Sequence, residues 1–319
     1  MSYEYTLGVD LGGTKTEIIA LDKRGSECFR KKVATVKASY GDTIKTICAL
    51  VLEAEQHLAC KCPLGIAIPG AVSEHTKRIK NANSFWLNDQ DLKGDLAKSL
   101  SKDEIFLEND ANCFALSEAE DGAGKDYATV WGLILGTGSG SGIVINKQVL
   151  RGRNLLSGEW GHTTLPWLTD EERELWRDVK CYCAREYCIE TFVSGVGFER
   201  DFAKRKGVFD PNALTFATTG KDIVELMAKG DHDAKACYEA YLDRLSRAIA
   251  AFSGFLDPDV IVLGGGMSNV NKLYEDLPDR VRHYIFGGEF DTPIVPNVYG
   301  SDSGVRGAAW LPLMHSAKG

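Results

Sequence analysis

The sequence DLGGTK at residues 10–15 joins two short segments, 5–10 and 16–21, that are rich in strand-forming residues. A third such segment, 28–33, follows the turn DKRG at 22–25. Short apolar runs separated by glycine-rich or aspartate-containing turns are typical of antiparallel strands, so we expect the chain to open as a β-meander. The glycines of the first turn let the backbone turn tightly and present successive N–H groups to an anion.

The same pattern recurs about half a chain later. Residues 129–135 and 142–146 are expected strands, and GTGSG at 136–140 is the turn between them. This recurrence suggests an internal duplication. A third glycine cluster, Gly-Gly-Gly at 264–266, follows the expected strand 260–263. Three glycine turns that each follow a strand favour a nucleotide bound in a cleft between two halves.

The rest of the chain alternates between helices and short strands. Residues 159–190 are irregular and rich in Cys, Trp, Pro and charge. No low-complexity linker separates the halves, so the helix at 111–124 is the expected boundary. Helices are expected at 43–58 (with Ser39 or Asp42 as N-cap), 92–100, 111–120, 221–229, 233–256 and 305–313, and further strands at 64–68 and 104–107.

Composition excludes several classes of protein. The 319 residues suggest about two domains, and 44% hydrophobic with 26% charged residues is ordinary for a globular chain. The net charge of −8 is poorly suited to nucleic acid or an anionic membrane surface. The first ten residues do not resemble a signal peptide, and no apolar run approaches the ~20 residues of a membrane span. Nine cysteines, an odd number, favour a reducing cytoplasm over a secreted disulfide framework.

The first glycine turn carries the groups that a phosphate site needs. Thr14 offers a hydroxyl, Lys15 a positive charge, and Asp10 is placed to hold a hydrated Mg²⁺. An ordinary hairpin turn is the alternative, and the Walker A pattern is absent. The presence of Asp, Thr and Lys in one turn, and the second turn at 136–138, favour phosphate binding.

Asp110 is the candidate general base. It follows the strand at 104–107 and opens a helix, in the sequence ENDAN at 108–112. A carboxylate there can take a proton from a hydroxyl, with Asn109 orienting the substrate. The alternative is that Asp110 serves only as the N-cap of the helix.

One histidine and three cysteines of the irregular segment match a tetrahedral zinc site. They are His162, Cys181, Cys183 and Cys188. Four protein ligands leave no open position, so the zinc would be structural and would order Glu159, His162 and Glu190 beside a substrate. Four unrelated buried side chains are the alternative, and dense cysteines in a cytosolic chain make zinc the better interpretation. The other cysteines are interpreted as loop thiols (Cys60 and Cys62) or core residues (Cys28, Cys48, Cys113 and Cys237).

These motifs, taken in order along the chain, resemble the ROK family (repressors, open reading frames and sugar kinases). They are D-x-G-G-T-K, Pro-Gly at 69–70, E-N-D-A-N, L-G-T-G-x-G-x-G, G-E-x-G-H, C-x-C-x₄-C-x-E and the Gly-Gly-Gly turn. The resemblance covers essentially the whole chain. It implies an α/β protein of the actin-like (ribonuclease-H-like) ATPase fold, with two α/β domains around a cleft. It also implies an N-terminal domain of residues 1–117 joined by the helix 305–319, and a C-terminal domain of residues 118–304 that contains the zinc segment 159–190.

The resemblance further implies ATP-dependent phosphorylation of a hexose with Mg²⁺ and a structural Zn²⁺. In the family pattern the zinc cluster reads C-x-C-G-x-x-G-C, whereas Ala184 and Tyr187 replace both glycines here, so any φ > 0 at these positions would be strained. The implied roles are the catalytic base (Asp110), sugar ligands (Gly70, Asn83, Asn109, Glu159, His162 and Glu190), nucleotide contacts (Asp10, Gly12, Gly13, Thr14, Lys15, Gly136, Thr137, Gly138, Gly264 and Gly265) and zinc ligands (His162, Cys181, Cys183 and Cys188).

The bacterial fructokinase branch is the most similar in three variable places. These are residues 80–88, the 19 positions from His162 to Cys181 with LPW at 165–167, and residues 303–311. We therefore expect a fructokinase acting at O6, with mannose as a second substrate. N-acetylglucosamine kinase or glucokinase is the alternative, and a bulky Trp86 or Trp167 would close the pocket that an acetamido group needs. A sugar-binding regulator without catalysis is disfavoured, because neither the base nor a phosphate turn is lost. We expect sugar and ATP as the small-molecule partners, and a homodimer.

Overall fold

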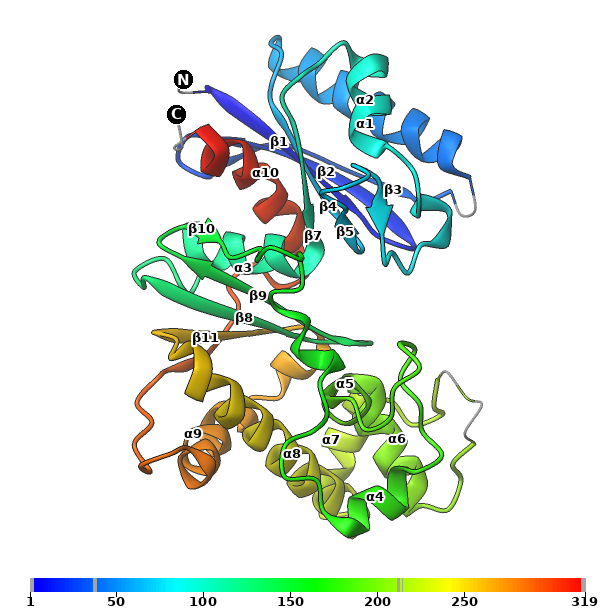
Figure 1. Ribbon diagram of the computed structural model, residues 1–319, viewed down its shortest axis with the longest axis vertical. Coiled ribbons are helices and arrows are strands. Elements are labelled where there is room, and N and C mark those ends of the chain that lie inside the picture. Colours follow the sequence, from blue (N-terminus) through cyan, green and yellow to red (C-terminus); the bar gives the residue numbers. More distant parts are fainter. Residues whose placement is uncertain (1–2, 37–38, 211–212, 214, 317–319) are drawn as a thin grey trace. The chain divides into compact units, whose positions relative to one another are not determined.

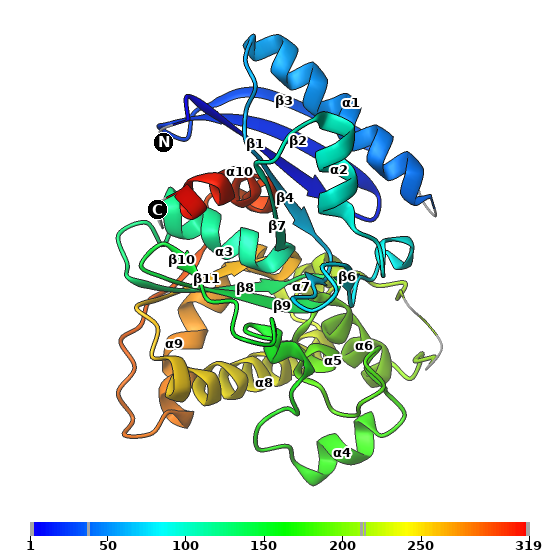
Figure 2. The same ribbon diagram turned by 45° about the horizontal axis from the view of Figure 1, so that its top comes forward.

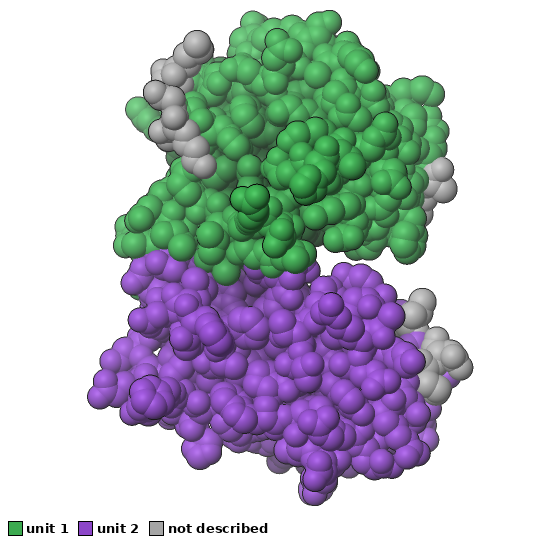
Figure 3. All heavy atoms as spheres, in the orientation of Figure 1, with its two compact units in different colours: residues 1–128, 142–157, 301–319 green, residues 129–141, 158–300 purple. Residues whose placement is uncertain are grey.

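The computed structural model describes residues 3–36, 39–210, 213 and 215–316. By its internal contacts the chain divides into two compact units, shown in Figure 3. Unit 1 comprises residues 1–128, 142–157 and 301–319, and unit 2 comprises residues 129–141 and 158–300. The chain thus changes unit several times, whereas the sequence interpretation places one change at residues 117–118 and a return near 305. The domain limits expected from the sequence, 1–117 with 305–319 and 118–304, therefore remain a prediction.

The first sheet confirms the opening β-meander. Its strand order is β3-β2-β1-β4-β7, with β1, β2 and β3 antiparallel and with β4 and β7 parallel to β1 (Figure 1). The strands are β1 (Tyr5–Leu11), β2 (Lys15–Asp22), β3 (Glu27–Ala34), β4 (Leu64–Ile68) and β7 (Ile105–Asn109). A two-stranded ribbon of β5 (Ala71–Val72) and β6 (Ile79–Lys80) follows β4.

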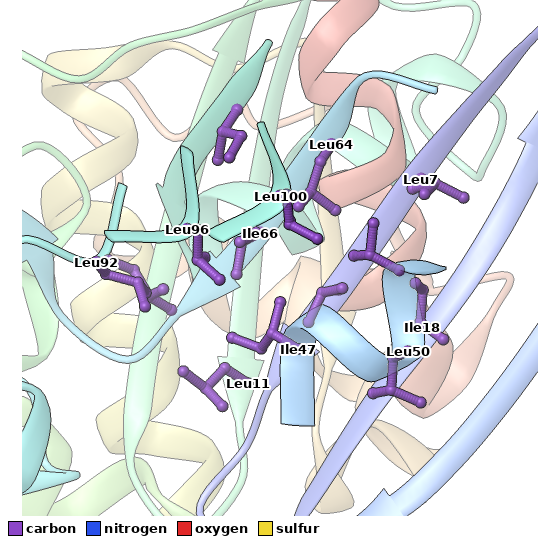
Figure 4. Packing of buried hydrophobic residues seen from close by; sticks show 14 of the residues in the cluster. Leu7, Leu11, Ile18, Ile47, Leu50, Leu64, Ile66, Leu92, Leu96 and Leu100 are labelled. Carbon is purple, nitrogen blue, oxygen red and sulfur yellow. The ribbon is translucent and has the colours of Figure 1, made fainter. Parts of the chain in front are cut away.

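The two faces of this sheet differ because successive side chains point to opposite sides. On one face, large apolar residues of the strands pack against α1 (Tyr40–Leu58) and α2 (Leu92–Leu100), as Figure 4 shows for Leu7, Ile47 and Leu96. On the other face, Gly8 allows α10 (Ser303–Ser316) to approach, since a Cβ there would lie 2.3 Å from the backbone oxygen of Val305. The same face of unit 1 carries α3 (Asp110–Glu120), which packs on α10.

The second sheet repeats the plan of the first. Its order is β10-β9-β8-β11-β12, again a three-stranded meander followed by two parallel strands. The strands are β8 (Thr129–Leu135), β9 (Ser139–Ile145), β10 (Gln148–Val149), β11 (Val260–Gly264) and β12 (Ile294–Pro296). The matching strand order agrees with the internal duplication suggested by the two glycine turns.

The helices of unit 2 include several that sequence periodicity did not predict. The two predicted helices, α7 (Gly220–Ala228) and α8 (His232–Leu256), are present, and α8 lies with α9 (Lys272–Tyr284) on one face of the sheet (Figure 2). In α4 only Glu172 and Trp176 are buried, so its sequence has no apolar periodicity that would predict a helix. The unpredicted helices are α4 (Asp170–Trp176), α5 (Ile189–Val193), α6 (Gly195–Arg205) and α9 (Lys272–Tyr284).

Within the residues that the structure describes, no helix is both long and apolar enough to span a membrane.

Candidate active site

The first glycine turn connects β1 to β2 in unit 1. The N–H of Gly12 donates to the backbone oxygen of Lys15 at 3.1 Å, which closes the turn. No atom of the described residues lies within 4 Å of where a Cβ of Gly13 would stand. The ammonium of Lys15 is half exposed and lies 3.8 Å from a carboxylate oxygen of Glu17. The turn therefore leaves backbone and one cation accessible to an anion.

Asp10, on the strand before this turn, is a perturbed carboxylate. Burial raises its pKa to about 7, with the negative charges of Asp110 and Glu17 adding to the effect and Lys15 opposing it. A nearby cation stabilises the ionised form of a carboxylate in such surroundings, because its positive charge offsets both the cost of burial and the repulsion from neighbouring carboxylates. This electrostatic setting fits the predicted hydrated Mg²⁺.

The junction of β7 and α3 excludes the alternative in which Asp110 is the N-cap of the helix. Asn109, and not Asp110, is the N-cap of α3: its Oδ1 accepts from the N–H groups of Ala111 at 2.9 Å and Asn112 at 3.3 Å. Asp110 is the first helical residue and is exposed, with Oδ1 2.8 Å from the N–H of Ala111. Since the cap is supplied by its neighbour, the carboxylate of Asp110 is held at the positive end of the helix dipole without being required as the cap.

Asn109 also connects the junction to Gly70. Its Nδ2 donates to the backbone oxygen of Gly70 at 3.1 Å. Gly70 has φ +101°, and a Cβ there would lie 2.5 Å from the backbone oxygen of Lys80. Glycine is therefore required at this position for both conformation and space.

The loop that carries Asn83 is held by a neighbouring asparagine. Asn88 accepts from the N–H of Ala82 and donates to its oxygen, both at 2.9 Å, while Asn83 itself is exposed. Sequence reasoning missed the role of Asn88, although asparagine side chains in loops commonly hydrogen-bond to nearby backbone.

Two further residues hold the junction of β7 and α3 in place. The buried carboxylate of Glu108 accepts from the N–H of Asn109 at 2.9 Å, from Nδ2 of Asn112 at 3.0 Å and from the guanidinium of Arg151. A buried charge that is paired and bonded in this way fixes its neighbours. Arg151 is far away in sequence and had no motif to identify it.

In unit 2 the second and third glycine turns lie against each other. Gly265 has φ +78°, and a Cβ there would lie 2.7 Å from the N of Gly136. The Gly136 turn is closed by its N–H donating to the oxygen of Gly138 at 3.0 Å, and its own oxygen accepts from the N–H of Gly195 at 2.7 Å. Gly264, Gly265 and the turn at 136–138 therefore form one continuous backbone surface, with Thr137 exposed on it.

Two carboxylates and an imidazole gather beside this surface. Oε2 of Glu190 accepts from the N–H of Ser139 at 3.0 Å, and a Cβ on Gly138 would come within 2.6 Å of the same oxygen. Oε2 of Glu159 lies 3.9 Å from Nε2 of His162. Burial raises the pKa of Glu159, His162 lowers it, and the charge of Glu190 raises it further. Such a group of acceptors suits the hydroxyls of a sugar.

The predicted metal ligands come together in the same unit. One ligand atom each from His162, Cys181, Cys183 and Cys188 lies within 4.8 Å of the others. Cys183 Sγ is 3.6 Å from Cys188 Sγ, and Cys181 Sγ is 3.4 Å from His162 Nδ1. Four ligands at Zn–S distances of about 2.3 Å around a tetrahedral ion are separated by about 3.8 Å, so the donor set and its spacing fit zinc.

The thiols of this group differ in acidity. Burial raises the pKa of Cys188 to about 11 and raises the pKa of Cys181 well above its usual value. In Cys183 burial acts in the same direction, but the N–H of Arg185 and the two neighbouring thiols outweigh it, so its pKa is lowered.

Ala184 and Tyr187 keep the left-handed backbone that glycines would supply. Their φ angles are +68° and +58°. Both residues thus carry a Cβ in the left-handed region, which costs about 1–2 kcal/mol of strain per residue. Tyr187 has compensating contacts, since its hydroxyl donates to the oxygen of Arg173 at 3.2 Å. Ala184 donates its N–H to the oxygen of Cys181 at 2.9 Å, a bond that any residue could make in its place.

The predicted site residues thus form one group in each unit. Unit 1 holds the first turn, Gly70, Asn83, Asn109 and Asp110, and unit 2 holds the other two glycine turns, Glu159, Glu190 and the metal ligands. Each group is ordered by its own hydrogen bonds, and the role of each residue in catalysis remains a prediction.

Comparisons with known proteins identify the family. The ROK family model matches residues 6–314. An N-acetyl-D-glucosamine kinase of Yersinia pseudotuberculosis is 36% identical over 309 residues, covering 96% of this chain and 98% of that protein. The crystal structure of a ROK hexokinase from Thermus thermophilus has a TM-score of 0.84 at 26% identity, over 99% of this chain and 100% of that one.

A second crystal structure agrees with this result. A ROK glucokinase from Streptomyces griseus, in complex with glucose and AMPPNP, has a TM-score of 0.75 at 26% identity, over 96% of this chain and 98% of that one. These similarities confirm the expected actin-like ATPase fold with two α/β domains. They do not support the fructokinase branch. The chain belongs to the ROK family.

Proposed function

We propose that this protein transfers the γ-phosphoryl group of ATP to a hydroxyl of N-acetyl-D-glucosamine. That it is an ATP-dependent sugar kinase follows from the family and from the kinases that match 96% of its length. The choice of sugar rests on one observation, the 36% identity to an N-acetyl-D-glucosamine kinase over 309 residues.

Asp110 is the proposed base. Phosphoryl transfer requires mainly positioning and charge neutralisation, and the attacking hydroxyl must lose a proton. The carboxylate of Asp110 is exposed at the start of α3, and Asn109 takes over the capping of that helix. Asp110 is therefore able to accept the hydroxyl proton, while Asn109 presents its amide beside Gly70.

The glycine turns are the proposed nucleotide contacts. The turn with Gly12, Gly13, Thr14 and Lys15 would hold phosphate oxygens, as would Gly136, Thr137 and Gly138, while Gly264 and Gly265 would border the adenosine. Asp10 would hold Mg²⁺, which neutralises phosphate charge when bound. The raised pKa of Asp10, which a cation would lower, supports this assignment.

Glu159, His162 and Glu190 are the proposed sugar ligands of unit 2, and Gly70, Asn83 and Asn109 those of unit 1. His162, Cys181, Cys183 and Cys188 would hold a structural Zn²⁺, whose part is to order the segment that carries the ligands. The hydrogen bond from Ser139 to Glu190 and the closeness of His162 to Glu159 support this grouping.

The indole rings that were expected to close an acetamido pocket have partners of their own. Trp86 donates from Nε1 to the hydroxyl of Thr43 at 3.2 Å and packs against the hydrophobic core of unit 1. Trp167 stacks on Tyr284, with ring centroids 5.7 Å apart. Both rings are thus held by their own neighbours, and the alternative that the sequence interpretation had ranked second is supported by the sequence identity.

A substrate comparison tests the proposal. The value of kcat/KM is measured with ATP and Mg²⁺ in an assay coupled to ADP formation, for N-acetylglucosamine, N-acetylmannosamine, glucose, mannose and fructose. We expect N-acetylglucosamine to exceed glucose by at least tenfold, because a site with bonds for an acetamido group leaves them unpaired when glucose binds. A preference for glucose or fructose would contradict the choice of sugar. Light scattering on the same protein tests the predicted homodimer.

A further inference from the structure

We infer that Cys60 and Cys62 form a redox-sensitive modification site, at which a low-molecular-weight disulfide such as glutathione disulfide converts the two thiols into a reversible internal disulfide. The observation behind it is that their Sγ atoms lie 3.5 Å apart, in a segment that the sequence suggested only as a loop with two thiols. Neither thiol takes part in the proposed kinase reaction. The pair precedes β4 and Gly70 follows it, so the thiols lie at the opposite end of that strand from the proposed sugar contact.

The backbone of this segment is fixed in the folded chain, so the two sulfurs are held near each other. The N–H of Cys60 donates to the backbone oxygen of Glu55, near the end of α1, at 3.3 Å. The N–H of Cys62 donates to Oε1 of Glu55 at 2.9 Å, and its oxygen accepts from the ammonium of Lys102. Glu55 and Lys102 form a buried ion pair at 2.5 Å. A disulfide has an S–S bond of about 2.05 Å, so side-chain rotation and a small shift of the exposed Lys61 can close it.

The two thiols differ in access to solvent, which sets the order of the reaction. Cys60 is partly exposed, whereas Cys62 is 3% exposed. Burial raises the pKa of Cys62 to about 12, and the hydrogen bond to Cys60 and its negative charge add to the effect, while Lys102 opposes it. Because the thiolate is the nucleophile, Cys60 reacts first. Once Cys60 has reacted it carries no charge, so one cause of the high pKa of Cys62 is removed before Cys62 has to ionise.

Two successive thiol–disulfide exchanges give the product. The thiolate of Cys60 attacks one sulfur of glutathione disulfide, forms a mixed disulfide and releases one glutathione thiolate. The thiolate of Cys62 then attacks the sulfur of Cys60, forms the internal bond and releases the second glutathione. The two thiol protons pass to the released glutathione thiolates, and the two electrons lost by the protein reduce the added disulfide. The bridge spans a single residue, and strained disulfides of this kind are easily reduced, which makes the change reversible.

The test uses the full chain, purified without chelator and treated with glutathione disulfide. The remaining thiols are alkylated and the protein is digested with trypsin, which cleaves after Lys61. The peptides that end at Lys61 and begin at Cys62 then stay joined only if a disulfide links them. We expect joined peptides from the treated protein, and their separation by dithiothreitol. The control Cys48→Ser removes the other thiol of the first peptide and should leave the joined peptides unchanged.

Two variants check the order of the steps. Cys62→Ser should stop at the mixed disulfide on Cys60, and Cys60→Ser should give no glutathione adduct at Cys62. Treated wild-type protein without joined peptides would overturn the inference, whether Cys60 carries glutathione or stays free. Joined peptides that form only in urea would also overturn it, because the folded arrangement would not be the cause. Circular dichroism verifies that the serine variants remain folded.

Discussion

Replacing Ala184 with glycine should strengthen the metal segment. Ala184 is exposed and has φ +68°, in the left-handed region where a Cβ crowds the backbone. It sits between the predicted ligands Cys183 and Cys188, so any strain there opposes closure of the turn around the metal. Glycine adopts this conformation without that crowding.

The size of the effect follows from two opposing terms. Left-handed backbone costs a residue with a Cβ about 1–2 kcal/mol. Against this, glycine lowers the stability of the folded state by about 0.5–1 kcal/mol, because an unfolded chain with glycine has more conformational entropy to lose on folding. The net gain is about 1 kcal/mol, and since a factor of ten is worth about 1.4 kcal/mol, zinc affinity should rise by about fivefold.

The assay is chelator competition for zinc, with urea unfolding of the metal-free chain alongside it. Tyr187→Gly provides the contrast: it relieves φ +58° but loses the hydroxyl bond to Arg173 and the guanidinium 5.9 Å from the ring, so we expect no gain. If Ala184→Gly binds zinc no more tightly than wild type, or if Tyr187→Gly gains as much, the argument from backbone strain is refuted.

Three further predictions concern the active site. Asp110→Asn should lower kcat by about 10²–10⁴-fold while the sugar still binds in calorimetry, because the base is lost, whereas the surface control Asp103→Asn should keep full activity. The pKa of Asp10 is about 7 in the folded protein and near its usual value of 3.8 in the unfolded chain, so ionisation of Asp10 destabilises the ligand-free fold increasingly from about pH 4 to 7. Asp10→Asn should therefore raise the urea midpoint of unfolding at pH 8 and leave it unchanged at pH 4. A gain of equal size at both pH values would contradict this. Gly138→Ala places a Cβ 2.6 Å from Oε2 of Glu190, which should break the hydrogen bond from Ser139 to this carboxylate and raise the KM for sugar by about tenfold. The control Gly254→Ala, whose Cβ meets no described atom within 4 Å, should leave this KM unchanged.

Several features of this protein could be predicted from its sequence because they depend on residues close together in the chain. The strands around residues 10–15 were predictable because a glycine turn between short apolar runs has few other solutions. The grouping of His162, Cys181, Cys183 and Cys188 was predictable because four residues of types that bind zinc strongly rarely cluster in a sequence by chance. The strain at Ala184 and Tyr187 was also predictable, since two glycines of the family pattern were missing.

Where a pattern had two physical explanations, the sequence left the choice between them open. Asp110 and Asn109 are both good capping residues, and only the backbone at the end of β7 decides that Asn109 caps α3. The bulk of Trp86 and Trp167 suggested a closed sugar pocket, and only the structure shows which neighbour holds each ring, Thr43 for Trp86 and Tyr284 for Trp167. Bulk is visible in a sequence, but the direction of a side chain is not.

By itself, then, the sequence determined the family, the kinase chemistry and the identity of the chemically distinctive residues, because these depend on residue type and short-range spacing. Tertiary structure alone decided the contacts between distant segments. The absence of a side chain at Gly8 lets α10, almost 300 residues later in the chain, pack against β1. Arg151 donates to the carboxylate of Glu108, and the hydroxyl of Tyr182 lies within hydrogen-bond distance of His162. Such pairs carry no local signal, since each depends on how the packing of whole strands and helices brings two otherwise ordinary side chains within bonding distance.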